Sequence, residues 1–161
     1  EADGTSAGIG RDLADHVLLN PPFYDAGRGT RSPQAARSSA HVMGAAGLDP
    51  WLRAAASVLK VRGDVTLIFR ADGLGEVLAA VGRRFGAVDL MPVHPRATLP
   101  ALRILVRAVK GSRAPLRILP PLVLHPDDGH GFHPAVEAIL RNGRALSHAN
   151  PAWQGARRAP S

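Results

Sequence analysis

The sequence predicts a single α/β domain built on a largely parallel sheet with an antiparallel last strand. Four apolar runs of strand length alternate with stretches of helical spacing, an order typical of a parallel sheet. The last two runs are joined by a loop and no helix, so we expect those two strands to be antiparallel. The chain of 161 residues has the size of one domain. The runs lie at residues 17–19, 65–69, 87–93 and 102–109, and the helical stretches at 49–61 and 72–85.

The composition indicates a polyanionic partner. The formal net charge is +7 and the pI is about 11.3, a balance that favours nucleic acid. The absence of cysteine excludes a disulfide framework and a thiolate metal site. No apolar stretch has membrane-spanning length and no signal peptide is recognisable. We therefore expect a cytoplasmic protein without a membrane partner.

One stretch near the start organises the rest of the chain. The run 17–19 is continuously apolar, which is typical of a buried parallel strand. Pro21 disfavours a helical backbone at Asn20, so the strand ends there in an extended turn. Neither Pro21 nor Pro22 has an N–H, so the turn offers carbonyl acceptors with few competing donors. Open α/β sheets bind ligands at this carboxyl end of their strands.

This turn carries the groups that an aromatic amine needs in order to become a nucleophile. The lone pair of the adenine amine is delocalised into the ring. The Asn20 side-chain oxygen and the Pro21 carbonyl can each accept one of its hydrogens, which favours a localised lone pair. Phe23, with Tyr24 as a weaker second, gives the base a face on which to stack. A plain strand followed by a proline turn is the alternative interpretation.

Glycine and arginine dominate the segments on either side of this stretch. Arg28 and Arg31 lie in a Gly/Arg loop that follows the turn, where they could contact a nucleic-acid backbone, although a solvated loop is equally compatible. Residues 4–10 are rich in glycine, but no strand precedes them, so we do not interpret them as a cofactor loop.

Three helices are expected before the last strand. Asp49 and Pro50 predict a helix start whose apolar face runs to residue 61, with Gly63 as the left-handed end residue. Asp72 is expected to cap a helix that ends at residue 85. A shorter helix is expected over residues 33–43, because a serine cap and a proline begin it.

The C-terminal part is expected to be an appendage. Two adjacent prolines confine residues 116–124 to an edge strand or an irregular segment. A helix at 134–141 ends near Gly143, and from residue 147 the pattern is lost. The loop at 125–133 holds several histidines and aspartates but no rigid element, so we predict no metal site. We expect a partial domain at 1–146, with the appendage at 115–146, and a flexible tail at 147–161.

The motif Asn20-Pro21-Pro22-Phe23 resembles the Asn-Pro-Pro-aromatic motif of S-adenosylmethionine-dependent amino-methyltransferases. More narrowly, residues 15–143 resemble the bacterial methyltransferases that act on adenine N6 at position 37 of a valine tRNA. The motif is shared with enzymes that modify DNA adenine, rRNA guanine and protein glutamine, so it is more specific for chemistry than for substrate. The other matching pieces are Asp49-Pro50-Trp51, Leu67-Ile68, His94-Pro95-Arg96 and Lys110-Gly111-Ser112-Arg113.

The resemblance implies the second half of a Rossmann-like class I methyltransferase sheet, from its fourth strand to its antiparallel seventh. It implies S-adenosylmethionine as cofactor and tRNA as partner. The glycine-rich loop of the first half has no counterpart here, so we expect the strand at 17–19 to have an uncovered edge and the isolated chain to be inactive. The implied catalytic residues are Asn20, Pro21, Pro22 and Phe23. The residues implied to bind the cofactor are Asp3 and Asn20. Those implied to bind the substrate are Tyr24, Arg28, Arg31, Arg96, Lys110 and Arg113.

Two alternatives stay open. A protein glutamine methyltransferase would use the same motif on an amide nitrogen, and a basic nucleic-acid-binding module would not catalyse at all. Salt-dependent RNA binding would separate the first alternative, because a protein substrate releases no condensed counterions. Cofactor binding by the intact protein would separate the second.

Overall fold

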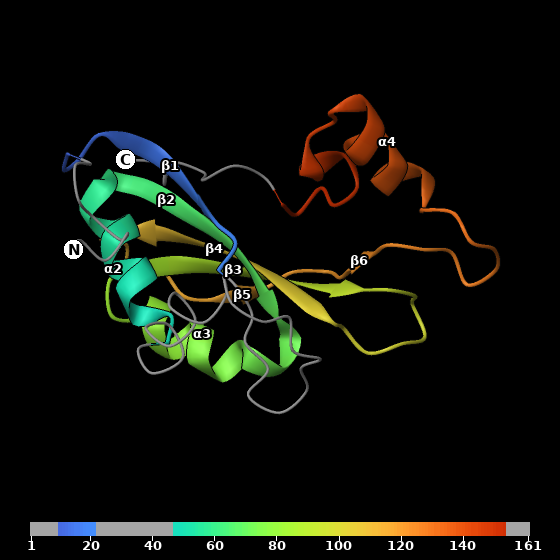
Figure 1. Ribbon diagram of the computed structural model, residues 1–161, viewed down its shortest axis with the longest axis horizontal. Coiled ribbons are helices and arrows are strands. Elements are labelled where there is room, and N and C mark those ends of the chain that lie inside the picture. Colours follow the sequence, from blue (N-terminus) through green and yellow to red (C-terminus); the bar gives the residue numbers. More distant parts are fainter. Residues whose placement is uncertain (1–9, 22–46, 154–161) are drawn as a thin grey trace, which may run out of the picture.

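A mixed sheet forms the centre of the molecule. The computed structural model describes residues 10–21 and 47–153, and within them the backbone forms one six-stranded sheet with helices against it (Figure 1). The strands are β1 (Ala14–Leu19), β2 (Leu59–Arg70), β3 (Phe85–His94), β4 (Arg103–Lys110), β5 (Arg117–Ile118) and β6 (Leu122–Val123). The helices of the same part of the chain are α2 (Asp49–Val58), α3 (Leu74–Val81) and α4 (Pro134–Asn142), with 3-10 turns at Ala71–Gly73 and Leu146–His148.

The strand order is β1-β2-β4-β3-β5, and β6 also pairs with β3. The β1–β2 pair is parallel, whereas β4 is antiparallel to both β2 and β3. The expected antiparallel arrangement of β3 and β4 is therefore confirmed. Because β4 runs against both neighbours, β1, β2 and β3 point the same way, and their carboxyl ends lie at one edge of the sheet. We call this the carboxyl edge and the opposite one the amino edge.

Helices α2 and α3 cover one face of the sheet, which we call the helix face. Alternate residues of β2, namely Val65, Leu67 and Phe69, join the core together with Leu52 of α2 and Val77 of α3. Leu52 and Val77 are completely buried. Burial of one such side chain stabilises the fold by about 1.5–3 kcal/mol, so this cluster contributes much of the stability of the sheet.

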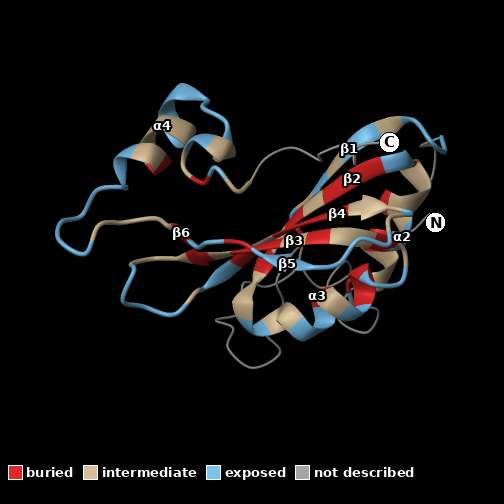
Figure 2. Cartoon of the chain, turned by 180° about the vertical axis from the view of Figure 1, so that it is seen from behind, coloured by how far each residue is buried: buried red, intermediate tan, exposed pale blue. Residues whose placement is uncertain are grey.

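The C-terminal appendage, residues 115–153, covers the other face over β3, and we call this the appendage face. β5 and β6 each pair with β3 as two-residue parallel strands on either side of the double proline, as an edge segment should. Val136 of α4 is buried in a second cluster with Met91 and Val93 of β3. Figure 2 shows the buried residues concentrated on the central strands, with few on the appendage.

Packing continues past residue 147, where the sequence pattern places a flexible tail. Asn150 is 4% exposed and its Nδ2 donates to the Pro120 carbonyl at 2.7 Å. Its Oδ1 accepts from the Ala152 amide at 3.1 Å, and Trp153 packs against the Met91 cluster. The chain therefore stays packed beyond residue 147, where the apolar periodicity is lost, because the Asn150 amide and the Trp153 indole hold it against the fold.

The junction between α2 and β2 differs from the expectation. α2 ends at Val58 and β2 begins directly at Leu59, so Gly63 lies inside the strand and does not end the helix. The left-handed residue is Arg62, with φ of 70°. The β1–β2 register shifts here, since Ala14 pairs with Leu59 but His16 pairs with Asp64. Gly63 is needed for close approach, because a Cβ there would lie 3.0 Å from the Asp15 carbonyl oxygen.

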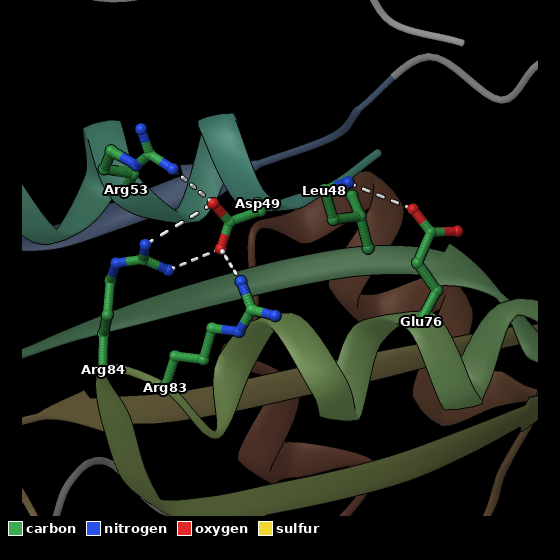
Figure 3. A network of polar contacts seen from close by, with 6 residues as sticks. All are labelled: Leu48, Asp49, Arg53, Glu76, Arg83 and Arg84. Atoms are coloured by element: carbon green, nitrogen blue, oxygen red, sulfur yellow. Dashed lines mark hydrogen bonds and ion pairs between the residues drawn. The ribbon is translucent and has the colours of Figure 1, made fainter. Parts of the chain in front are cut away.

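Asp49 does not cap α2 as expected. Leu48 is the N-cap residue, and Asp49, the first helical residue, pairs instead with arginines (Figure 3). Its carboxylate accepts from Arg53 at 2.7 Å and from Arg84 at 2.8 Å. The Arg84 hydrogen bond, followed by that of Arg53, lowers the pKa of Asp49 from 3.8 to about 2. Asp49 therefore links α2 to the turn that follows α3.

Asp72 likewise makes no capping hydrogen bond. It lies in the 3-10 turn that precedes α3, and the helix ends at Val81, so that Phe85 already begins β3. The N-terminus of α2 is also tied to α3, because the Leu48 amide donates to Glu76 Oε1 at 3.1 Å (Figure 3). α3 is thus shorter than the helix that its apolar pattern predicts.

β1 is less buried than a continuously apolar run predicts. Leu18 is 80% exposed, and Val17 and Leu19 are only partly buried against the helix-face core. Within the described residues β1 pairs with β2 alone, so its outer edge and its appendage face lack the neighbours that burial requires. None of the helices in the described ranges is both long and apolar enough to cross a membrane.

Candidate functional site

The Asn20-Pro21 turn lies at the carboxyl edge of the sheet. Leu19 pairs with Leu67 of β2, so Asn20 is the first residue beyond the β1–β2 ladder. Asn20 is exposed, whereas Pro21 is completely buried. A buried proline next to an exposed amide fixes the backbone of the turn and leaves the Asn20 side chain accessible. The structure therefore has an exposed acceptor and donor group at the position where open α/β sheets bind ligands.

The start of β1 is held by two lysines. Lys60 Nζ lies 3.0 Å from Asp15 Oδ2, and Lys110 Nζ lies 2.8 Å from Asp12 Oδ1. Lys110 also donates to the Leu59 carbonyl at 2.5 Å. The Leu13 amide donates to the Val58 carbonyl at 2.8 Å, which continues the attachment before β1 begins. These contacts fix the amino end of the strand that carries Asn20 at its other end.

A buried charge network crosses the sheet in the middle of β1, β2 and β4. Asp64 of β2 is 3% exposed and accepts hydrogen bonds from two sides. His16 Nδ1 of β1 pairs with its Oδ1, and Arg107 Nε of β4 donates to its Oδ2 at 2.6 Å. Arg107 is itself only 7% exposed. A buried carboxylate needs such partners, so the network fixes the register of β1 against β2 and β4.

The row of charges continues across β3 to β5. Asp89 of β3 is the register partner of Arg107, and its carboxylate accepts two hydrogen bonds from Arg117 of β5, both at 2.8 Å. The Asp89 hydrogen bond raises the pKa of Arg117 above its ordinary value. Charged residues of alternating sign therefore follow one another from β2 to β5 on the appendage face: Asp64, Arg107, Asp89 and Arg117.

Arg96 lies near the carboxyl edge, but its side chain binds the backbone of the loop at 125–133. It pairs with the Pro126 carbonyl and donates to the Gly129 carbonyl at 2.9 Å. His94 Nδ1 donates to the Leu99 carbonyl at 2.7 Å and closes the β3–β4 hairpin. His94 and Arg96 thus shape loops at this edge, and the role of Arg96 as a contact to the nucleic-acid backbone stays a prediction.

Lys110 and Arg113 are not brought together with Asn20. Lys110 pairs with Phe85, the first residue of β3, and therefore lies at the amino edge. β1 alone separates the two edges by about 20 Å, six residues of strand rise. Arg113 follows Lys110 in the same turn and is exposed. The structure therefore does not bring Lys110 and Arg113 together with Asn20, and their roles as contacts to the nucleic-acid backbone stay predictions.

The remaining predicted site residues lie outside the described part of the chain, and their roles stay predictions. They are Asp3, Pro22, Phe23, Tyr24, Arg28 and Arg31.

The histidine-rich loop at 125–133 is organised by hydrogen bonding and stacking. His125 Nδ1 donates to the Gly131 carbonyl at 2.9 Å, and its ring stacks on Phe132 with centroids 4.9 Å apart. Among the residues that the structure describes, no group of three or more His, Asp or Glu side chains is arranged to hold a metal ion.

Sequence reasoning missed the buried charge network. A signal was present, because Arg107 lies within the apolar run at 102–109 and Asp64 directly precedes the run at 65–69. A charge at such a position is buried only when it is paired, and two such runs in one sheet can supply the pair. The residue that completes the network, His16, precedes the run at 17–19 and has no distinctive neighbourhood in sequence.

The comparison with solved structures decides the fold. The chain aligns with the crystal structure of a predicted O-methyltransferase, protein Atu636 from Agrobacterium tumefaciens, at a TM-score of 0.70 and 34% sequence identity. The alignment covers 90% of this chain. The chain has a methyltransferase fold. It spans 62% of the length of that neighbour. No family profile and no curated protein matches the chain.

The methyltransferase fold accounts for the strand order. The order β1-β2-β4-β3, with β4 antiparallel in the middle, is the order expected for the fourth, fifth, seventh and sixth strands of a class I sheet. The predicted fold class is therefore confirmed. In this methyltransferase fold, Asn20 stands directly after the strand that corresponds to the fourth.

Proposed function

We propose that this chain is part of an S-adenosylmethionine-dependent N-methyltransferase that acts on an exocyclic nucleobase amine, adenine N6 of a tRNA. The observation that carries the proposal is the exposed Asn20 amide on a buried Pro21 at the carboxyl end of β1. The methyltransferase neighbour supports the reaction class at 34% identity. The substrate class rests on the sequence motif and on the positive charge.

The Asn20-Pro21 turn activates the amine by accepting its two hydrogens. The Asn20 side-chain oxygen takes one N–H and the Pro21 carbonyl takes the other. Both acceptors favour the amine with its lone pair on nitrogen. With S-adenosylmethionine bound, the N–C bond would form as the S–CH₃ bond of the sulfonium breaks, and S-adenosylhomocysteine would leave. The proton leaves to solvent after the attack. Positioning and electrostatics supply the rate acceleration of such a reaction, so the turn must be rigid.

The described residues fit the substrate side of a cofactor site. S-adenosylmethionine supplies a methyl group on a sulfonium, which is reactive without further activation by the protein. Asn20, which is exposed at the carboxyl edge, would orient the amine toward that methyl group. The other residue expected to hold the cofactor, Asp3, lies outside the described part of the chain.

A nucleic-acid substrate agrees with the charge of the chain. The net charge of +7 attracts a polyanion, and Phe23 follows the turn as a candidate stacking partner. The alternatives of a protein glutamine substrate and of a non-catalytic binding module predict the absence of transfer to RNA.

A second candidate function is methyl transfer to a hydroxyl oxygen. The neighbour is described as a predicted O-methyltransferase, which favours an oxygen nucleophile for this fold. An oxygen nucleophile has one proton and no need for two acceptors, so the paired acceptors of the turn favour nitrogen. The product distinguishes the two, because a methylated amine and a methyl ether give different nucleosides by mass spectrometry.

The test uses the protein as its gene encodes it, with radiolabelled S-adenosylmethionine and unmodified total tRNA. We expect label in N6-methyladenosine after nuclease digestion. Asn20→Ala should abolish transfer and leave cofactor affinity within a few-fold. Asn20→Asp, which keeps an acceptor oxygen, should retain part of the activity. Wild-type turnover by Asn20→Ala, or label only in protein or in a methyl ether, would refute the proposal.

A further inference from the structure

Three arginines converge on one carboxylate where α2 meets the turn after α3 (Figure 3). The Asp49 carboxylate accepts from Arg53 Nη2 at 2.7 Å and from Arg84 Nη1 at 2.8 Å. Arg83 Nη1 lies 3.5 Å from the same group. Three positive charges therefore surround one negative charge, and we call these arginines the arginine cluster. Like charges this close repel one another, so a further anion would stabilise the cluster.

The three arginines differ in exposure. The Arg84 side chain is 24% exposed and contacts both Asp49 oxygens, so it joins α2 to the turn after α3. The Arg53 side chain is 70% exposed and that of Arg83 is 68% exposed. Within the described residues, Asp49 is the sole side-chain partner of both. A guanidinium group has five N–H donors, so Arg53 and Arg83 keep donors for a ligand.

Asp49 holds the arginine cluster in place at neutral pH. The Arg84 hydrogen bond, followed by that of Arg53, lowers the pKa of Asp49 to about 2, so this carboxylate stays charged. An arginine side chain that is already held loses less conformational entropy when it binds a ligand. The cluster is thus preorganised for an anion.

The arginine cluster adjoins a basic turn at the amino edge. Arg84 directly precedes Phe85, the first residue of β3, which pairs with Lys110. The Gly111 amide donates to the Arg84 carbonyl at 3.3 Å, so the turn after β4 lies against the residues that follow α3. The exposed Arg113 belongs to this turn. A predicted contact to the nucleic-acid backbone and the arginine cluster therefore lie at one end of the molecule.

The surroundings of the arginine cluster favour a polyanion over a lipid surface or an apolar protein partner. No exposed large apolar side chain lies on α2, on α3 or in residues 110–113, all of which the structure describes. Glu76, the other acid in this view, accepts from the Leu48 amide at 3.1 Å (Figure 3). Arginine binds phosphate oxygens through paired N–H groups, and a nucleic-acid backbone presents such phosphates in a row.

We propose that Arg53 and Arg83 contact the phosphate backbone of the nucleic-acid substrate at a surface separate from the Asn20 turn. This inference rests on the proposed function for its substrate class. The amino edge lies about 20 Å of strand rise from the carboxyl edge that carries Asn20, the length of about six stacked nucleotides. A substrate that reaches both surfaces is therefore a folded RNA and not a short oligonucleotide.

The experiment measures binding of a fluorescently labelled tRNA by anisotropy, with the full chain and with variants, from about 50 to 200 mM KCl. The variants are Arg53→Gln, Arg83→Gln, their double variant and the double Lys variant. Arg141→Gln is the matched control, because Arg141 is 75% exposed and pairs with Glu137 four residues before it at 3.0 Å, as Arg53 pairs with Asp49, but lies on α4. Circular dichroism checks that each variant is folded.

Each single Gln variant should lower the slope of log affinity against log salt by about one unit, and the double Gln variant by about two. The two contacts account for about 12-fold of the affinity that the wild type loses between these salt concentrations, at a slope of about 0.9 per phosphate. Arg141→Gln and the double Lys variant should keep the wild-type slope. An unchanged slope in the double Gln variant, or an equal decrease in Arg141→Gln, would overturn the inference.

Two further measurements separate this inference from other outcomes. If the slopes change as expected but the wild type does not methylate tRNA, the backbone contact stands and the proposed function fails. If the wild type methylates tRNA and the double Gln variant keeps the wild-type KM and salt slope, the proposed function stands and the backbone contact fails. Binding of the wild type to phosphatidylserine vesicles without binding to tRNA would assign the cluster to a membrane surface and overturn the inference.

Discussion

Asp64→Asn should be among the most destabilising single substitutions in this chain. The change keeps the shape of the side chain and removes its negative charge, so the cavity contribution is small. Asp64 is 3% exposed and Arg107 is 7% exposed, which means that both ions have left most of their hydration shell. Without the carboxylate, the cost of desolvating the Arg107 guanidinium is no longer balanced by the Arg107 Nε–Asp64 Oδ2 bond of 2.6 Å.

The magnitude follows from this burial. Breaking a buried ion pair by removing one partner costs about 3–5 kcal/mol. The free energy of unfolding of an ordinary domain is about 5–15 kcal/mol, so the variant should lose about a fifth of its stability or more. At about 2–4 °C per kcal/mol, the midpoint of thermal unfolding should fall by roughly 6–20 °C. His16→Gln should cost less than about 1 kcal/mol, because the His16 side chain is 71% exposed.

The measurement is urea unfolding followed by circular dichroism, with a double-mutant cycle. Asp64→Leu combined with Arg107→Met removes both charges, and it should be far more stable than Asp64→Asn alone, because a buried pair replaced by apolar residues is close to neutral. If Asp64→Asn costs less than about 1 kcal/mol, or if the double variant is as unstable as the single one, the pair is not desolvated as described.

Three further predictions concern other parts of the chain. Phe23→Ala should weaken tRNA binding by about 1–3 kcal/mol and Phe23→Tyr should be nearly silent, which titration with tRNA can measure; wild-type binding by Phe23→Ala and by Phe23→Leu would exclude stacking. Because the pKa of Asp49 is lowered from 3.8 to about 2, its ion pairs stabilise the fold above pH 4, and this stability should be lost as the pH falls from about 4 to 2; an Asp49→Asn variant should show a smaller loss over that window in acid unfolding, and an equal loss would contradict the assignment. Gly86→Ala should lower the free energy of unfolding by about 1–3 kcal/mol, because a Cβ there would lie 2.2 Å from the Ser112 carbonyl oxygen. Gly75→Ala, at an exposed position of α3 with nothing within 4 Å of a Cβ, should stabilise the fold slightly. Equal unfolding midpoints of the two variants would refute the clash at Gly86.

Local sequence signals predicted those helices and strands whose conformation is set mainly by their own residues. The apolar runs gave β2, β3 and β4, and the missing helix between the last two gave their antiparallel pairing. Gly143, with φ of 62°, ends α4 as its left-handed residue, as expected. In each case one or two residue types restrict the backbone strongly, so the prediction needs no knowledge of the neighbours.

Signals that depend on distant partners were not readable from the sequence. Val61 continues the apolar pattern of α2, yet the segment pairs with β1, and this pairing makes it a strand. Leu18 lies in an apolar run and is nevertheless exposed. Its burial depends on which other segments cover β1, and the run itself does not contain this information. Trp153 and Asn150 lie beyond the last recognisable pattern and pack only because β3 and the Pro120 carbonyl are near.

The sequence indicated where Asn20 lies in the fold but not where the other candidate residues lie relative to it. Asn20 lies where the strand-end rule places it, since that rule needs only the parallel strand before it. β4 runs antiparallel to β2, so Lys110, at the end of β4, lies at the amino edge. Its role as a contact to the nucleic-acid backbone stays a prediction.

The position of β4 affects the order in which the chain can assemble during synthesis. β2 and β3 both pair with β4 and not with each other, so a nascent chain that ends before residue 103 has the two strands but not the one that joins them. Until then the edges of β2 and β3 are exposed and free to pair wrongly. The sheet can close only after Lys110 has left the ribosome, so the pairing of β4 with both β2 and β3 is the expected late step.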